Sequence, residues 1–119
     1  PNAVPAAHAS KCADKQRKFW EMHDLIFENQ GNWKNMEPLQ SLDLFKKYSD
    51  EIGVDGDVYD SCMSTAKHID EIKKDLEDGR DYGVTGTPGF FVGNEEIGFT
   101  KIIGAQPFSS FQRVIDGFE

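Results

Sequence analysis

The chain is poor in cysteine, with only Cys12 and Cys62 among its 119 residues. The two lie far apart in the sequence, and no CxxC motif occurs anywhere. A zinc ribbon and a local redox dithiol both need closely spaced cysteine pairs, so this sequence encodes neither. The number of cysteines alone does not indicate whether the protein works in a reducing or an oxidising compartment, because one disulfide and two buried thiols both use two cysteines.

Long apolar runs and an excess of positive charge are also missing. No stretch approaches the roughly 18 apolar residues that a membrane-spanning helix needs, and the chain does not open with a charged-then-apolar signal peptide. The formal net charge is −8, which makes nucleic acid an unfavourable partner because its phosphates repel an acidic surface. Because the first residue is Pro1 and not Met, we expect a processing or cloning boundary and further sequence upstream.

What is present indicates a folded chain. Hydrophobic residues make up 38% of it, and the aromatic residues are spread along its whole length, whereas disordered chains have few aromatics. A length of 119 residues is enough for one modest domain with a core.

Residues 1–83 have the apolar spacing of short helices joined by short connections. We expect helices over residues 2–15, 16–29 and 39–52, one that follows Asp55 and one that follows Thr65. Gly53 is expected to end the third helix, and Asp55 is expected to cap the fourth. The predicted core of this part consists of Phe19, Trp20, Ile26, Phe27, Leu42, Phe45 and Ile72.

The pattern changes at Val84, so we place a boundary there and treat residues 84–119 as a C-terminal part. Residues 85–88 favour a turn, residues 90–92 a strand, and residues 101–103 a returning strand after a longer connection over residues 95–100. Pro107 is expected at the start of a last helix. Its predicted buried stripe is Phe108, Phe111, Ile115 and Phe118. Two strands alone form a marginal sheet, so the sequence predicts a larger sheet than it supplies.

Three stretches carry a family resemblance: KFWEMHD at residues 18–24, GVTGTP at residues 83–88 and GAQPF at residues 104–108. Their order and distances resemble those of DsbA-like proteins, and a Thr-Pro turn before strand, strand and helix resembles the second half of the thioredoxin fold. The resemblance covers essentially the whole chain. It implies an α/β, thioredoxin-like fold that is incomplete here: a helical insert, then a β-hairpin and a C-terminal helix.

The resemblance implies a protein thiol–disulfide oxidoreductase that forms or isomerises disulfides in the periplasm or cell envelope, without a cofactor. In that family a CxxC thiolate at a helix N-terminus attacks the substrate disulfide. The CxxC segment would precede Pro1, so we expect this chain to be a fragment without catalytic residues and inactive alone. The part of the family's site that docks the substrate does lie within this chain. We expect a cis bond before Pro88 that turns the Thr87 backbone toward an extended substrate. A trans proline that simply starts a strand is the alternative.

Other functions stay open. DsbA-like folds also include glutathione-dependent isomerases and transferases, whose serine-type site lies in the region that this chain lacks, and a non-catalytic binding module is a third possibility. The partners implied are protein thiol or disulfide substrates. A homodimer through the sheet edge that lacks neighbouring strands is also expected.

Cys12 and Cys62 lie on helices that are expected to pack together, which leaves two states open. The sequence favours buried free thiols, whereas a structural disulfide would close a loop of about 50 residues and contribute about 3–4 kcal/mol. His8 and His68 could complete four zinc ligands with them. The spacing crosses a helix boundary and matches no finger pattern, so we predict no metal site. His23 is expected to pack or to cap a helix.

Overall fold

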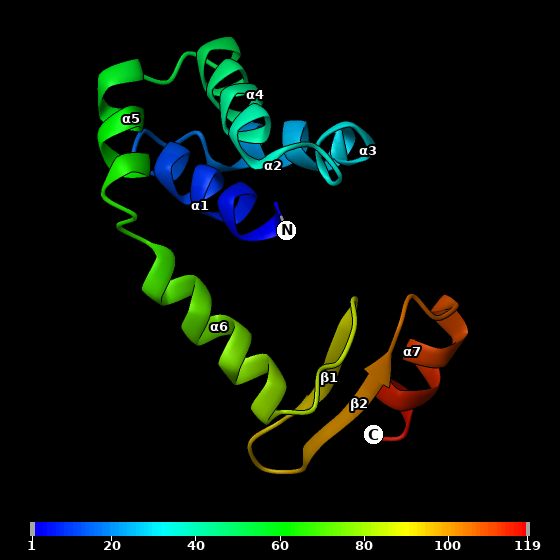
Figure 1. Cartoon of the computed structure of the whole chain (residues 1–119). Helices are drawn as coiled ribbons and strands as arrows, with labels where there is room; N and C mark the ends of the chain where they lie inside the picture. The colour runs from blue at the N-terminus through cyan, green and yellow to red at the C-terminus, as the bar shows by residue number, and fades with distance from the viewer. Residues whose placement is uncertain (1, 119) are drawn as a thin grey trace. The chain divides into compact units, whose positions relative to one another are not determined.

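A computed structural model describes residues 2–118 of the chain. Over these residues, helices come first, and a β-hairpin and a last helix follow (Figure 1). The elements are α1 (Ala3–Asp14), α2 (Phe19–Glu28), α3 (Gln30–Trp33), α4 (Pro38–Glu51), α5 (Gly56–Ser64), α6 (Ile69–Asp81), β1 (Gly89–Asn94), β2 (Gly98–Ile103) and α7 (Phe108–Asp116). This order confirms the expected helical part followed by a hairpin and a helix.

The chain divides into two compact units, Pro1–Asp75 and Leu76–Glu119. The division falls within α6, a few residues before the boundary that the sequence suggests at Val84. Among the described helices, none is both long and apolar enough to cross a membrane.

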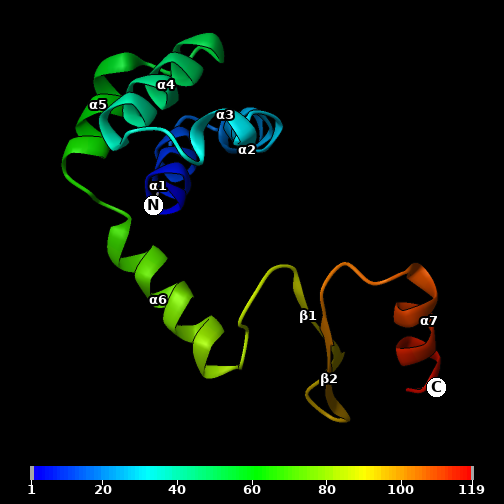
Figure 2. The same cartoon turned by 45° about the vertical axis from the view of Figure 1, so that its right-hand side comes forward.

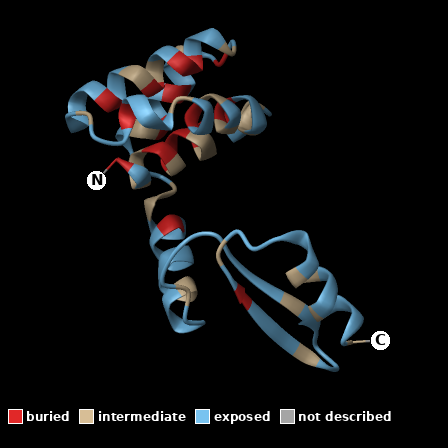
Figure 3. Cartoon of the chain, turned by 90° about the vertical axis from the view of Figure 1, so that its right-hand side faces the viewer, coloured by how far each residue is buried: buried red, intermediate tan, exposed pale blue. Residues whose placement is uncertain are grey.

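α1 lies at the centre of the helical unit. It packs against α2, α4 and α5, and Figures 1 and 2 both show these helices gathered around it. Ala6, Ala9 and Ala13 of α1 are buried, and their small side chains let the neighbouring helices approach closely. Buried residues are concentrated in this unit, as the red segments of Figure 3 show.

The connection between α4 and α5 forms as the sequence predicts. Asp55 caps α5, because its carboxylate accepts hydrogen bonds from the N–H groups of Asp57 and Val58, both at 3.0 Å. Gly53 follows α4 with a φ of +81°, a left-handed conformation that glycine adopts without a Cβ clash. α5 then packs against both α4 and α1.

The predicted helical core is partly wrong. Its buried members are Ile26, Phe45 and Ile72. Its exposed members are Trp20 at 67%, Phe27 at 61% and Leu42 at 37%. Successive residues of an α-helix lie about 100° apart around its axis. Trp20 and Phe27 each follow an inward-facing position of α2 by one residue, which turns them toward solvent.

Trp33 and Asn2 contribute to this core, although the sequence analysis does not include them. The Trp33 indole N–H donates to the carbonyl of Ile26 at 2.8 Å, and its ring meets Phe45 edge-on at 5.6 Å between centroids. The buried side-chain amide of Asn2 donates to the carbonyls of Trp33 and Met36, both at 2.8 Å. These bonds tie the start of α1 to the α3 segment.

β1 and β2 form an antiparallel hairpin in which Asn94 pairs with Gly98. The Asn94 side-chain oxygen accepts hydrogen bonds from the N–H groups of Glu96 at 2.9 Å and Ile97 at 3.0 Å, which closes a tight turn. The expected connection over residues 95–100 is therefore too long, because β2 already begins at Gly98.

α7 lies beside the hairpin (Figure 2). The Phe111 ring meets that of Phe90 edge-on at 4.9 Å between centroids. The predicted buried stripe of this helix is wrong for Phe108, which is 76% exposed, and for Ile115, at 47%. Among the described residues 76–118, Ile102 is the one that is buried. Two strands offer too narrow a face to cover a helix stripe.

We expect backbone amides of α2 to exchange with deuterium more slowly than those of residues 101–118. Nearly all buried apolar side chains of the described residues lie in the helical unit, whereas the hairpin and α7 leave theirs largely exposed. Hydrogen exchange followed by NMR or mass spectrometry on the chain measures this difference. Equal protection in the two regions would contradict the expectation and would indicate that the hairpin unit has acquired a further packing partner.

Candidate functional site

The turn before β1 holds the first pair of predicted site residues, Thr87 and Pro88. The peptide bond between them is cis, the form that the sequence leads us to expect. Both residues are exposed. Within the described residues 2–118, the N–H and the C=O of Thr87 form no hydrogen bond.

The two ends of this turn are held in place. At its start, the N–H of Val84 donates to the carbonyl of Gly79 at 2.8 Å, and the ammonium group of Lys101 contacts the carbonyl of Gly83. At its end, the N–H of Gly104 donates to the carbonyl of Pro88 at 2.9 Å. A segment anchored at both ends presents its free backbone groups in a fixed orientation, which suits hydrogen bonding to an extended peptide.

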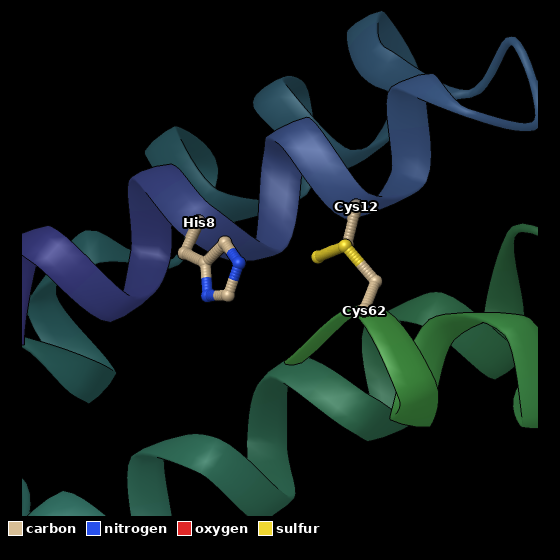
Figure 4. A group of neighbouring side chains, drawn as sticks. All are labelled: His8, Cys12 and Cys62. Atoms are coloured by element: carbon tan, nitrogen blue, oxygen red, sulfur yellow. A yellow bond between two sulfur atoms is a disulfide. The ribbon is translucent and has the colours of Figure 1, made fainter. Parts of the chain in front are cut away.

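The second pair of predicted site residues, Cys12 and Cys62, is joined by a disulfide between α1 and α5 (Figure 4). The sequence favours free thiols, and the structure contradicts that preference. The relative accessibilities of the two cysteines are 0% and 3%, and their Cα atoms are 5.7 Å apart. α1 and α5 pack against each other, and the separation of their cysteine Cα atoms lies in the usual range for a disulfide.

His8 lies one helical turn before Cys12 on α1, and Figure 4 shows its imidazole beside the disulfide. One ligand atom of His8 and the two sulfur atoms lie within 4.8 Å of one another, and all three residues are buried. Burial lowers the pKa of His8, and the neighbouring His68 lowers it further. The imidazole of His8 is therefore held in its neutral form near pH 7.

His68 adjoins His8 from the segment between α5 and α6. Its backbone N–H donates to Nε2 of His8 at 3.5 Å, and the two rings are 5.9 Å apart in an edge-on arrangement. Nδ1 of His68 lies 3.4 Å from a carboxylate oxygen of Glu71, and Nε2 is buried without a hydrogen-bond partner among the described residues. Lys11 holds the other Glu71 oxygen at 3.1 Å and, with His68, lowers the pKa of that carboxyl.

A surface cavity of about 460 Å³ reaches Cys62 from outside the helical unit. Lys15 and Lys67 lie on its wall, and the proximity of Lys67 lowers the pKa of Lys15. The carboxylate of Asp57 lies on the same wall, so two cationic groups and one anionic group surround this approach to the disulfide.

The remaining histidine, His23, has the packing role that the sequence predicts. Its ring contacts those of Trp20 and Phe27, at 5.1 Å and 4.7 Å between centroids, and Nδ1 lies 3.1 Å from a carboxylate oxygen of Asp24. The side chain is 36% accessible and lies on the solvent-facing part of α2.

We expect the Cys12→Ala/Cys62→Ala double variant to be less stable than the oxidised protein by about 3–4 kcal/mol. The cross-link closes a loop over a sequence separation of 50 and so restricts the unfolded chain. Urea denaturation followed by far-UV circular dichroism measures the difference. An unchanged denaturation midpoint would show that the bridge does not form in solution. The oxidised and chemically reduced wild type provide the control pair.

Comparison with known proteins identifies the family. A family model for the DSBA-like thioredoxin domain matches residues 2–116. The chain is 33% identical over 92 residues to a protein named Na(+)/H(+) antiporter NhaA 3 from Salinispora tropica, and 34% identical over 92 residues to Na(+)/H(+) antiporter NhaA 1 from Salinispora arenicola. Each match covers 77% of this chain and 13% of the relative.

A third relative, Na(+)/H(+) antiporter NhaA 1 from Mycolicibacterium vanbaalenii, is 31% identical over 94 residues, and the match covers 14% of its length. The chain thus spans about a seventh of these relatives or less. No solved structure matches the chain. Because the family model covers nearly all of its residues, the chain belongs to the DSBA-like thioredoxin domain family.

Proposed function

We propose that this domain acts in thiol–disulfide exchange on protein substrates and that Thr87 and Pro88 dock the substrate. The observation that carries the proposal is the pair of free backbone groups of Thr87, exposed in a turn that is anchored at both ends, in a chain of the DSBA-like family. An extended peptide can pair with such groups in the manner of an added strand. Pro88 has no N–H to compete for that peptide and no side chain that could bind a metal.

The reacting dithiol of this proposal lies outside the 119 residues. Within the chain, the two cysteines are bonded to each other and buried in the helical unit, and no CxxC occurs. Exchange needs an accessible thiolate, which a buried disulfide does not provide. The chain therefore supplies the docking surface and the helical insert, and a CxxC segment supplies the nucleophile.

The names of the relatives describe ion transport by those proteins, and we do not extend transport to this chain. Each shares with it a region that covers only 13–14% of its own length. We propose that this region is a DsbA-like domain in those proteins too, because the family model spans the corresponding residues of this chain.

A non-catalytic binding module is the second candidate function. It is favoured by the same pairing of both cysteines in a buried disulfide, which leaves the chain with exposed docking groups and without a free thiol.

A lasting disulfide also supports the proposal that the domain works outside the cytoplasm, where thiols are not kept reduced.

The outer edges of the hairpin are the proposed place of contact with further strands. β1 and β2 pair only with each other among the described residues, so each strand has one edge whose backbone groups are free to bond. Strands of the same domain or those of a second copy could occupy these edges, and we propose edge pairing with one of the two.

The chain alone is expected to show no insulin reduction and no dithiol oxidation above background. If joined behind a strand–CxxC–helix segment of a DsbA-like protein, it should gain exchange activity that Pro88→Ala reduces. A turbidity assay and a peptide oxidation assay measure these activities. A well-folded fusion that binds peptide but performs no exchange would favour the binding module. Activity of the chain alone that disappears in Cys12→Ala would overturn the assignment of Cys12 and Cys62 as a structural pair.

An extended peptide is expected to shift the amide resonances of Gly86, Thr87 and Gly89 in an NMR titration. Thr87→Pro removes the donating N–H and should weaken binding about tenfold, the loss of one well-placed hydrogen bond. Thr87→Ala keeps both backbone groups and is the matched control, which should bind like the wild type. If both variants bind equally well, the Thr87 backbone is not the docking group.

A further inference from the structure

The residues around the Cys12–Cys62 bridge combine two features that a cross-link does not need. A buried imidazole nitrogen of His8 lies within 4.8 Å of both sulfur atoms (Figure 4). A second buried imidazole nitrogen, Nε2 of His68, adjoins His8 and has no hydrogen-bond partner among the described residues. An unsatisfied buried polar atom destabilises the folded state, so its presence calls for a ligand or another explanation.

We propose that, once the disulfide is reduced, Cys12, Cys62, His8 and His68 form a tetrahedral site for Zn²⁺, although their spacing in the sequence led us to predict no metal site. Two thiolates and two imidazoles are a donor set that zinc uses in structural sites. The site lies entirely within the helical unit and does not depend on the function proposed above.

The donors fit the dimensions of a zinc centre. His8 and Cys12 are separated by four positions on α1, a spacing that places both side chains on one face of a helix. Zinc bonds of about 2.0–2.3 Å put ligand atoms about 3.3–3.8 Å apart in a tetrahedron. The ligand atoms of His8, Cys12 and Cys62 already lie within 4.8 Å of one another. His68 lies outside this group, with its ring 5.9 Å from that of His8 between centroids, so its imidazole has to move toward the sulfur atoms to complete the site. Breaking the S–S bond also frees the two sulfur atoms to separate.

His68 is oriented as a zinc-binding histidine usually is. Metal-bound histidines commonly donate the N–H of their other ring nitrogen to a carboxylate, which fixes the tautomer and the ring orientation. Glu71 lies 3.4 Å from Nδ1 of His68, which makes Nδ1 the protonated nitrogen and leaves the lone pair of Nε2 for a metal. Lys11 in turn holds Glu71 through the 3.1 Å contact.

His8 meets a further requirement of a ligand, because an imidazole must be neutral to bind a metal. Its burial favours the neutral form, because a buried imidazolium ion would lose its hydration. Its Nε2 accepts only the long 3.5 Å hydrogen bond from the backbone of His68, which a metal can replace.

The Cys12–Cys62 disulfide and the zinc site exclude each other, because both use the same two sulfur atoms. The conversion of one into the other is a balanced reaction. A dithiol reductant gives two electrons and two protons to the Cys12–Cys62 bond and becomes a disulfide itself. Zn²⁺ then displaces the two thiol protons into solvent and binds the thiolates. The cavity that reaches Cys62, lined by Lys15, Lys67 and Asp57, gives a thiolate reductant a route to the bridge.

The test is a Co²⁺ titration, then a Zn²⁺ competition, on the full chain after reduction with a phosphine, which does not hold the metal. The reduced protein should bind one Co²⁺, with the d–d absorption of tetrahedral coordination and a thiolate charge-transfer band. Zn²⁺ should displace the Co²⁺. The oxidised protein should bind at least about 100-fold more weakly, because a disulfide supplies no thiolate.

Single substitutions locate the ligands. His8→Ala and His68→Ala should each weaken binding at least about tenfold, whereas His23→Ala, which changes the third histidine of the chain, should have no effect. Glu71→Gln should weaken binding about tenfold through His68, and Asp70→Asn is its matched control. Glu71 has a side-chain accessibility of 62%, so its substitution leaves the core intact even if a histidine variant fails to fold.

The proposed zinc site is ruled out if the reduced wild-type protein shows no thiolate charge-transfer band with Co²⁺. It is also ruled out if Glu71→Gln and Asp70→Asn bind Co²⁺ with equal affinity and the histidine variants, when folded, bind Co²⁺ as tightly as the wild type does. Far-UV circular dichroism checks the folding of each variant before titration.

Discussion

The close contact between α1 and α5 is the constraint on which the helical unit depends. The Cα atoms of Cys12 on α1 and Cys62 on α5 are 5.7 Å apart, a separation that lets the two side chains form a disulfide. The same closeness brings His8 next to both sulfur atoms. The bridge and the histidine next to it therefore depend on the same contact between the two helices.

The hairpin unit follows a different principle. It buries little, and its one buried residue in the described part, Ile102, lies on β2. Its aromatic residues instead form pairs, such as Phe90 with Phe111 and Tyr82 with Phe91. A unit of this kind keeps backbone groups available, and docking an extended peptide requires free groups of that kind. The small size of the two-stranded hairpin therefore accounts both for the low burial of this unit and for the free backbone groups on which the proposed function depends.

Local signals in the sequence were sufficient for the order of elements and for several of their ends. Asp55 before a helical stretch and Gly53 after one act through atoms that are neighbours in the chain, so a sequence pattern can specify them. The GVTGTP stretch likewise placed the turn at Thr87 and Pro88 because its chemistry is local. The family could be inferred for the same reason, from three short stretches in a fixed order.

Features that depend on contacts between distant segments could not be read in this way. Whether Cys12 and Cys62 are bridged depends on the distance between two helices, and no residue next to either one encodes that distance. The exposure of Trp20 and Phe27 depends on how much of α2 its neighbours cover, whereas hydrophobicity alone placed both in the core. The meeting of His8 and His68 required the fold as well.

The cluster also shows why cysteine pairing alone does not define the role of a site. A cross-link stabilises by restricting the unfolded chain, which needs two sulfur atoms and no histidine. A neutral imidazole beside the sulfur atoms and a carboxylate that orients a second imidazole add nothing to that effect, yet both are what a metal centre requires. Since a bound metal stabilises only the folded state, it could replace the stabilisation that the bridge provides when the bridge is reduced. The helical unit would then be held together in either redox state by the same pair of cysteines.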